Sequence, residues 1–153
     1  MTKFSFPCCD IEVEFTPEVV KDLGQFRQIV GYTEAGGLLF TSDLYSNPIL
    51  IEKFSIPSAQ DKRTRHRFIP HKTKAQKIIN EMFENGFHYV GDWHTHPQKY
   101  PKPSRTDINT IKDVFKKSDH NLNYMLMLVL SNSEDFENSY LGLTNGKVLF
   151  EPI

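Results

Sequence analysis

The chain has 153 residues, of which 39% are hydrophobic, and this length and composition predict one globular domain over residues 1–153. Its 18 basic and 19 acidic residues give a formal net charge of -1, so the overall charge favours neither nucleic acid nor an anionic membrane as a partner. No segment approaches the ~18 to 20 apolar residues that a membrane-spanning helix needs, and no apolar run follows a basic start at the N-terminus. We therefore expect a cytoplasmic location.

The two cysteines, Cys8 and Cys9, are neighbours in the sequence. Adjacent cysteines cannot cross-link distant parts of a fold, and we expect both thiols to be reduced. A metal role is the alternative, but no second cysteine and histidine cluster at zinc-finger spacing accompanies them.

The first third of the chain predicts a strand, a helix and two further strands. Residues 11–15 alternate between apolar and polar side chains, which is typical of a short strand. Residues 16–26 begin with a threonine cap and Pro17, and continue with apolar residues at helical spacing. Strands are expected at 34–41 and at 49–56.

The middle of the chain begins with a strongly basic segment, residues 58–74, which predicts a loop. We expect this segment to be a solvated surface; a substrate contact is the second interpretation and a nucleic-acid contact the third. Apolar residues from 75 to 83 recur at helical spacing before Asn85-Gly86 and predict an amphipathic helix, and residues 87–93 predict a strand.

The last third begins with three prolines within residues 97–103, which exclude regular structure there. A helix is expected from 104 to 115, and the unbroken apolar run 124–130 predicts a strand covered on both faces. A hairpin is expected from 139–143 and 147–150, with Asn145-Gly146 indicating a type I′ turn.

The segment most informative about function contains His94 and His96, followed by Ser104 and Asp107. Two histidines two residues apart at the end of a strand point to the same face, so both imidazoles can reach one ion. Asp107 in the first turn of the next helix can add a carboxylate, which completes a catalytic zinc site with one open position. Each half also has an ordinary interpretation, since paired histidines are often exposed and Ser-x-x-Asp is a common helix cap.

These residues resemble the signature of the JAMM or MPN-type metallopeptidases, a glutamate on an early strand followed by His-x-His-x7-Ser-x-x-Asp. The match from His94 to Asp107 has no gap. The resemblance implies an α+β domain with an α/β/α-like MPN fold, in which about three helices flank a curved mixed β-sheet. The order of the expected elements agrees with that fold over nearly the whole chain.

The resemblance also implies a role for each residue of the signature. One zinc ion per chain would be held by His94, His96 and Asp107, and Glu34 would be the general acid/base for a zinc-activated water. Glu34 is chosen because residues 34–39 look like the family's Glu-x-x-Gly-x-Leu strand. Ser104 matches the serine that stabilises the oxyanion.

The implied substrate is a ubiquitin-like protein or a protein conjugate, cut after the ubiquitin-like C-terminus at an isopeptide or a linear peptide bond. An open groove near Gly36 and Gly37 would suit an extended, glycine-rich tail. Arg63 and Arg65 of the basic segment are further expected substrate contacts. Neither nucleic acid nor a membrane is an expected partner.

Residues 57–68 also look like the basic loop of the short stand-alone bacterial members of this family. Some of these act beside ubiquitin-activation-like enzymes in antiphage CBASS operons, which implies deconjugation in antiviral defence and adds a conjugated nucleotide cyclase to the expected substrates. The insertions by which eukaryotic members grip linked ubiquitin chains are hard to fit into 153 residues.

Two alternatives stay open at this point. One is a catalytically silent MPN scaffold for protein interaction, although such scaffolds usually lack a ligand that this sequence keeps. The other is a zinc hydrolase that trims peptides or a sulfur-carrier protein, or a relative of the RadC-type DNA-repair proteins.

Overall fold

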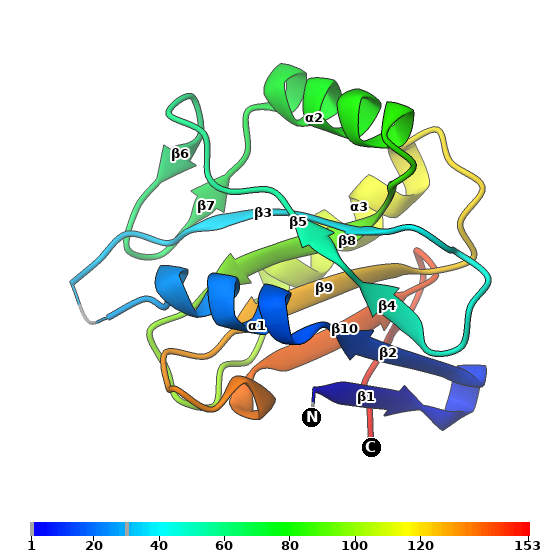
Figure 1. The fold of residues 1–153 in the computed structure, drawn as a ribbon. Helices are drawn as coiled ribbons and strands as arrows, with labels where there is room; N and C mark the ends of the chain where they lie inside the picture. Colours follow the sequence, from blue (N-terminus) through cyan, green and yellow to red (C-terminus); the bar gives the residue numbers. More distant parts are fainter. Residues whose placement is uncertain (1, 30) are drawn as a thin grey trace.

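The computed structural model describes residues 2–29 and 31–153, and its centre is a mixed six-stranded sheet (Figure 1). The strand order is β11-β10-β9-β8-β3-β5. Neighbouring strands are antiparallel except for β8 and β9, which are parallel. The strands are β3 (Gly36–Thr41), β5 (Lys53–Phe54), β8 (His88–Thr95), β9 (Met125–Leu130), β10 (Tyr140–Thr144) and β11 (Leu149–Phe150).

A second, three-stranded sheet consists of β1 (Lys3–Phe6), β2 (Ile11–Phe15) and β4 (Ile49–Ile51). Strand β2 has the predicted bounds, whereas β1 was not predicted. Near the other end of the chain, Ile153 N donates to Ser5 O at 3.0 Å, so the two termini lie side by side (Figure 1).

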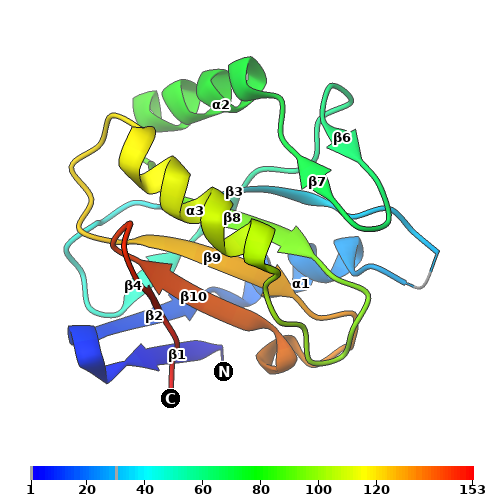
Figure 2. The same ribbon diagram turned by 180° about the vertical axis from the view of Figure 1, so that it is seen from behind.

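In the described part of the chain three helices flank the large sheet, as predicted: α1 (Pro17–Leu23), α2 (Lys72–Glu84) and α3 (Arg105–Lys117). Figures 1 and 2 show α1 and α3 on opposite faces of the sheet. Single 3-10 turns are η1 (Pro7–Cys9), η2 (Gly24–Phe26) and η3 (Phe136–Asn138). The α+β class and the mixed sheet with three helices are confirmed. None of the helices among residues 2–29 and 31–153 has the length and apolar character that crossing a membrane requires.

The large sheet is covered on both faces at strand β9. All six of its residues are buried. Met125, Met127 and Val129 pack with Ile111 of α3. The alternating residues Leu126, Leu128 and Leu130 join the larger core with residues of α1, β1 and β2. The two-residue period of a strand places these sets on opposite faces, as the unbroken apolar run predicts.

The predicted single strand at 49–56 is instead two short strands, β4 and β5, which belong to different sheets. The chain passes from one sheet to the other at Glu52, whose backbone N donates to Phe40 O at 3.1 Å. Two consecutive charged residues, Glu52 and Lys53, interrupt the apolar pattern at this crossing, but they do not show that the two parts pair with different sheets.

The basic segment 58–74 is not only a loop. It contains the hairpin of β6 (Lys62–Arg63) and β7 (Phe68–Ile69), and α2 already begins at Lys72. The predicted type I′ turn is also wrong. Gly146 has a φ of 90°, but Asp10 is the only non-glycine residue with positive φ in the described part of the chain, so Asn145 lacks the conformation that this turn requires.

Candidate metal centre

The C-terminal end of β8 places the two signature histidines together. Strand β8 extends to Thr95 and so includes His94, beyond the predicted end at Trp93. Trp93 is 1% exposed and faces the larger core, and the alternation of the strand therefore directs His94 to the side of α3. The rings of His94 and His96 lie 5.0 Å apart between centroids.

Asp107 reaches the same point from the first turn of α3. Its Oδ2 lies 3.2 Å from His94 Nε2 and 3.3 Å from His96 Nε2. Ser104 caps the helix, and its backbone N donates to the same Oδ2 at 2.8 Å. The helix cap therefore fixes the carboxylate that faces the two imidazoles.

Glu34 lies just before β3, which begins at Gly36 and not at residue 34 as predicted. Its side chain is buried, with 3% of the residue exposed. One carboxylate oxygen of Glu34 and one ring nitrogen each of His94 and His96 lie within 4.8 Å of one another. The neighbouring strand explains this approach, because β3 and β8 are paired with Gly36 opposite His94.

The donor atoms fit a divalent ion such as zinc. His94 Nε2 is buried and makes no hydrogen bond of acceptable geometry to a described residue, although Asp107 Oδ2 is close. Two ligands of a tetrahedral zinc ion with bonds of about 2.0–2.1 Å lie about 3.3 Å apart, which is the separation of Asp107 Oδ2 from both nitrogens. Two imidazoles and a carboxylate are the ligands of catalytic zinc sites that keep an open position.

Burial and charge shift the pKa values of this cluster in the protein chain alone. Burial raises the pKa of Glu34 to about 7, with His96 opposing the shift and Asp107 adding to it. Burial opposes ionisation of Asp107, but its contacts with His94 and His96 hold its pKa well below the usual range. For His96, burial favours the neutral ring, yet the hydrogen bond and charge of Asp107 outweigh it and raise the pKa.

Ser104 and Asp92 also lie in this region. Ser104 Oγ accepts from Asp107 N at 3.0 Å, so the hydroxyl hydrogen is free to donate to another group. Asp92 Oδ1 accepts from the Tyr89 hydroxyl at 2.6 Å, and burial raises the pKa of Asp92 to about 6.

Packing within the chain explains why Gly36 and Gly37 are glycines, without any contact to a substrate. A Cβ on Gly36 would lie 2.5 Å from the Phe68 ring, and a Cβ on Gly37 would collide with the backbone oxygen of Ser55. Both positions therefore require glycine for the packing of the chain itself, and their contact with a substrate stays a prediction.

The two predicted arginines lie on the hairpin of β6 and β7 or in its turn. Arg63 Nε donates to Glu34 O at 2.8 Å, so Arg63 contacts the backbone of the proposed base. Arg65 is exposed, and its backbone O accepts from Gln28 Nε2 at 3.0 Å. A substrate contact by either side chain stays a prediction.

A cavity of about 160 Å³ beside the cluster shows residues that the sequence did not single out. It is lined by Glu34, His94 and Asp107, by Arg67 and Phe68 of the hairpin region, and by Thr110 and Val114 of α3. Arg67 is one of several basic residues in its segment, and nothing in the sequence distinguishes it from Arg63 or Arg65.

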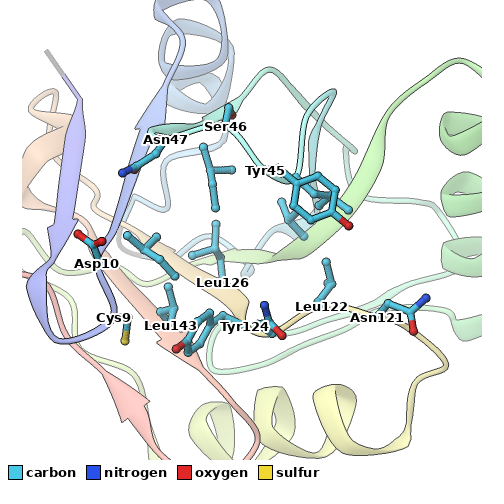
Figure 3. Close-up of a pocket in the computed structure, with 15 residues that line it drawn as sticks. Cys9, Asp10, Tyr45, Ser46, Asn47, Asn121, Leu122, Tyr124, Leu126 and Leu143 are labelled. Carbon is cyan, nitrogen blue, oxygen red and sulfur yellow. The ribbon is translucent and has the colours of Figure 1, made fainter.

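A second pocket, of about 340 Å³, shares no lining residue with that cavity. Figure 3 shows Ser46 and Asn47 across the hollow from Tyr124 and Leu143. Cys9 contributes to the lining, and its Sγ lies 3.3 Å from Cys8 Sγ, with both thiols free. No residue of the predicted signature reaches this pocket.

Proteins named as isopeptidases are among those similar to this chain. Over 105 residues the chain is 35% identical to the CD-NTase/cGAS isopeptidase of Escherichia coli (strain TW11681), a match that covers 66% of this chain and 67% of that protein. Over 92 residues it is 39% identical to the protein of the same name from Pseudomonas aeruginosa, which covers 56% of this chain and 58% of that protein.

A solved structure shares the fold at low sequence identity. It is the solution structure of protein DSY2949 from Desulfitobacterium hafniense, with a TM-score of 0.63 at 18% identity over 92% of this chain and 89% of that one. The family model described as prokaryotic homologs of the JAB domain matches residues 28–140, which include Glu34, both histidines and Asp107. The chain therefore belongs to the prokaryotic JAB family, the JAMM or MPN group that its signature indicates.

Proposed function

We propose that this chain is a zinc-dependent isopeptidase that hydrolyses the bond after the C-terminus of a ubiquitin-like protein. The observation that carries the proposal is the convergence of His94, His96 and Asp107, with a buried glutamate beside them. The ligand set, the zinc and the role of Glu34 are parts of this proposal.

Zinc held by these residues would polarise the substrate carbonyl and lower the pKa of water to about 7. The Glu34 carboxylate accepts a proton from the attacking water and later donates it to the departing amine, which must leave protonated. Burial supports this exchange, because it raises the pKa of Glu34 to about 7, where the carboxyl group can take up and release a proton near neutral pH. Ser104 donates its free hydroxyl hydrogen to the carbonyl oxygen as negative charge develops there.

The cavity between the hairpin and α3 suits a narrow peptide tail. Phe68 and the α3 residues Thr110 and Val114 line it. A volume of about 160 Å³ leaves little room for side chains next to the scissile bond, which favours glycine there. The relatives named CD-NTase/cGAS isopeptidase support a conjugated CD-NTase, the nucleotide cyclase of the antiphage systems, as the physiological substrate.

The test is a cleavage assay with three substrates: a lysine conjugate of a ubiquitin-like protein, a linear fusion of the same protein, and a short peptide. We expect the zinc-loaded enzyme to cleave the conjugate, a chelator to stop the reaction, and added zinc to restore it. Cleavage of the short peptide alone would favour the trimming hydrolase, and no cleavage by zinc-loaded protein would favour the silent scaffold.

The variant Glu34→Gln tests the proposed base. We expect kcat to fall by about 10²- to 10⁴-fold while the zinc content stays unchanged, because proton transfer fails and the ligands remain. Glu134→Gln is the matched control, since Glu134 is exposed and outside the cluster. Near-normal turnover by Glu34→Gln would remove Glu34 from the mechanism.

A further inference from the structure

The backbone of Glu34 and Ala35 is held from two sides. Glu34 N donates to Thr64 O at 2.7 Å, and Arg63 Nε donates to Glu34 O at 2.8 Å. Ala35 N donates to Thr95 Oγ1 at 2.9 Å, and Thr95 N donates to Ala35 O at 2.9 Å. All four backbone polar groups of these two residues are therefore hydrogen-bonded, two to the hairpin region and two to Thr95, the residue between the signature histidines.

Gln28 connects the two sides. Its Oε1 accepts from Thr95 Oγ1 at 3.1 Å, and its Nε2 donates to Arg65 O at 3.0 Å and to Tyr32 O at 2.8 Å. One side-chain amide thus links the end of β8, the turn of the hairpin and the segment that leads to Glu34.

This glutamine is buried, with 2% of the residue exposed, and Thr95 is fully buried. Burying an amide costs free energy unless its groups are hydrogen-bonded, and here both amide hydrogens and the oxygen have partners. A bonded network of this kind allows one arrangement of its members and resists others, because any movement leaves a polar group unpaired.

We propose that Gln28 is a positioning residue that acts through Glu34. It fixes the threonine hydroxyl and the hairpin turn that together hold the Glu34-Ala35 backbone, so that the Glu34 carboxylate keeps its place beside His94 and His96. This inference rests on the proposed function only where it concerns turnover, because the restraint on the backbone belongs to the fold.

The first test is Gln28→Met, which keeps the size of the side chain and removes its hydrogen bonds. We expect kcat to fall about 10²-fold, the loss that a displacement of about 1 Å brings, with KM within about threefold and the metal content unchanged. Gln25→Met is the matched control, because Gln25 is exposed three residues earlier. An unchanged kcat, or a loss of metal that accounts for the fall in kcat, would overturn the proposal.

A double-mutant cycle shows whether the effect passes through Glu34. In a Glu34→Gln background, Gln28→Met should lower the residual kcat by less than about twofold, because the group being positioned is already absent. A further fall of the same size as in the wild type would mean that Gln28 acts by another route and would contradict the proposal.

Thr95 tests the same link from its other end. Thr95→Val removes the hydroxyl and keeps the shape, and it should reproduce the kcat loss of Gln28→Met. Thr95→Ser keeps the hydroxyl and should restore most of the activity. Equal effects of valine and serine at this position would contradict the hydrogen-bonded link.

Amide hydrogen exchange gives a readout that needs no substrate. In Gln28→Met we expect the Ala35 amide to exchange about tenfold faster, while the amide of Leu128 in the sheet centre keeps its wild-type rate. Unchanged exchange at Ala35 would overturn the positioning role. If the wild type hydrolysed no substrate but Ala35 responded in this way, the proposed function would fail and the restraint by Gln28 would stand.

Discussion

Ser104 and Asp107 exchange two hydrogen bonds at the start of α3, and the same Asp107 oxygen that accepts from Ser104 N lies against both imidazoles. The sequence motif Ser-x-x-Asp has two interpretations, a helix cap and half of a metal site. The geometry shows that these interpretations are compatible, because one carboxylate oxygen serves the cap and faces His94 and His96.

Asp107→Ala should lose zinc and destabilise α3 together. We expect zinc affinity to fall at least about 100-fold. This is more than the loss caused by removing a residue that only hydrogen-bonds to a metal ligand. The lost cap should cost about 1 kcal/mol of folding stability. Zinc content by elemental analysis and thermal unfolding measure the two effects. Asp113→Ala is the control on the same helix, since Asp113 is exposed and has only a 3.9 Å ion pair with Lys117. Full zinc occupancy in Asp107→Ala would place the third ligand elsewhere.

Ser104→Gly separates the proposed role of the Ser104 hydroxyl in turnover from its role in capping α3. Glycine is tolerated at the N-cap position of a helix at a cost of only a few tenths of a kcal/mol, so the melting temperature should barely change. Loss of the hydroxyl should lower kcat about 10²- to 10³-fold, as expected for a donor to the developing oxyanion. Steady-state kinetics with the ubiquitin-like conjugate measure the change. A kcat within about twofold of the wild type would leave Ser104 with its structural role alone.

Gly37→Ala should destabilise the fold before any substrate is present. The new Cβ would lie 2.8 Å from both Ser55 Oγ and Trp93 Nε1, and it would also collide with the Ser55 backbone. We expect a loss of about 1–3 kcal/mol in thermal or denaturant unfolding. Gly24→Ala is the control, because its Cβ would meet only the Arg27 side chain at an ordinary 3.5 Å. Unchanged stability of Gly37→Ala would remove the packing explanation for this glycine.

Local patterns explain how much of the molecule the sequence predicts. The helix at 16–26, the helix before Asn85-Gly86 and the buried strand at 124–130 follow from caps and periodicity, and the structure has all three. Pairing partners do not follow from such patterns. The break at Glu52 and the unpredicted strand β1 depend on which strand lies alongside, and the sequence does not record that choice.

The candidate site divides in the same way. The histidine pair and Asp107 lie within 14 residues and form a local motif, and Glu34 was found through the family signature. Gln28 belongs to no motif. Its bond to Thr95 spans 67 residues of sequence, so only the folded chain brings the two side chains together.

The stability of the metal-free protein should depend on pH through Glu34. The pKa of Glu34 is about 7 in the folded chain against an ordinary value of 4.5, chiefly because the carboxyl group is buried. The folded chain therefore holds this proton more tightly than the unfolded chain, and the resulting stability is complete below pH 4.5 and is lost as the pH rises through about 7. The glutamine side chain of Glu34→Gln cannot ionise. After chelation, the melting temperature of this variant should therefore rise relative to that of the wild type as the pH increases from about 5 to about 8. Glu134→Gln should follow the wild type, and a difference between Glu34→Gln and the wild type that does not change with pH would show that the Glu34 carboxyl group keeps an ordinary pKa in the folded protein.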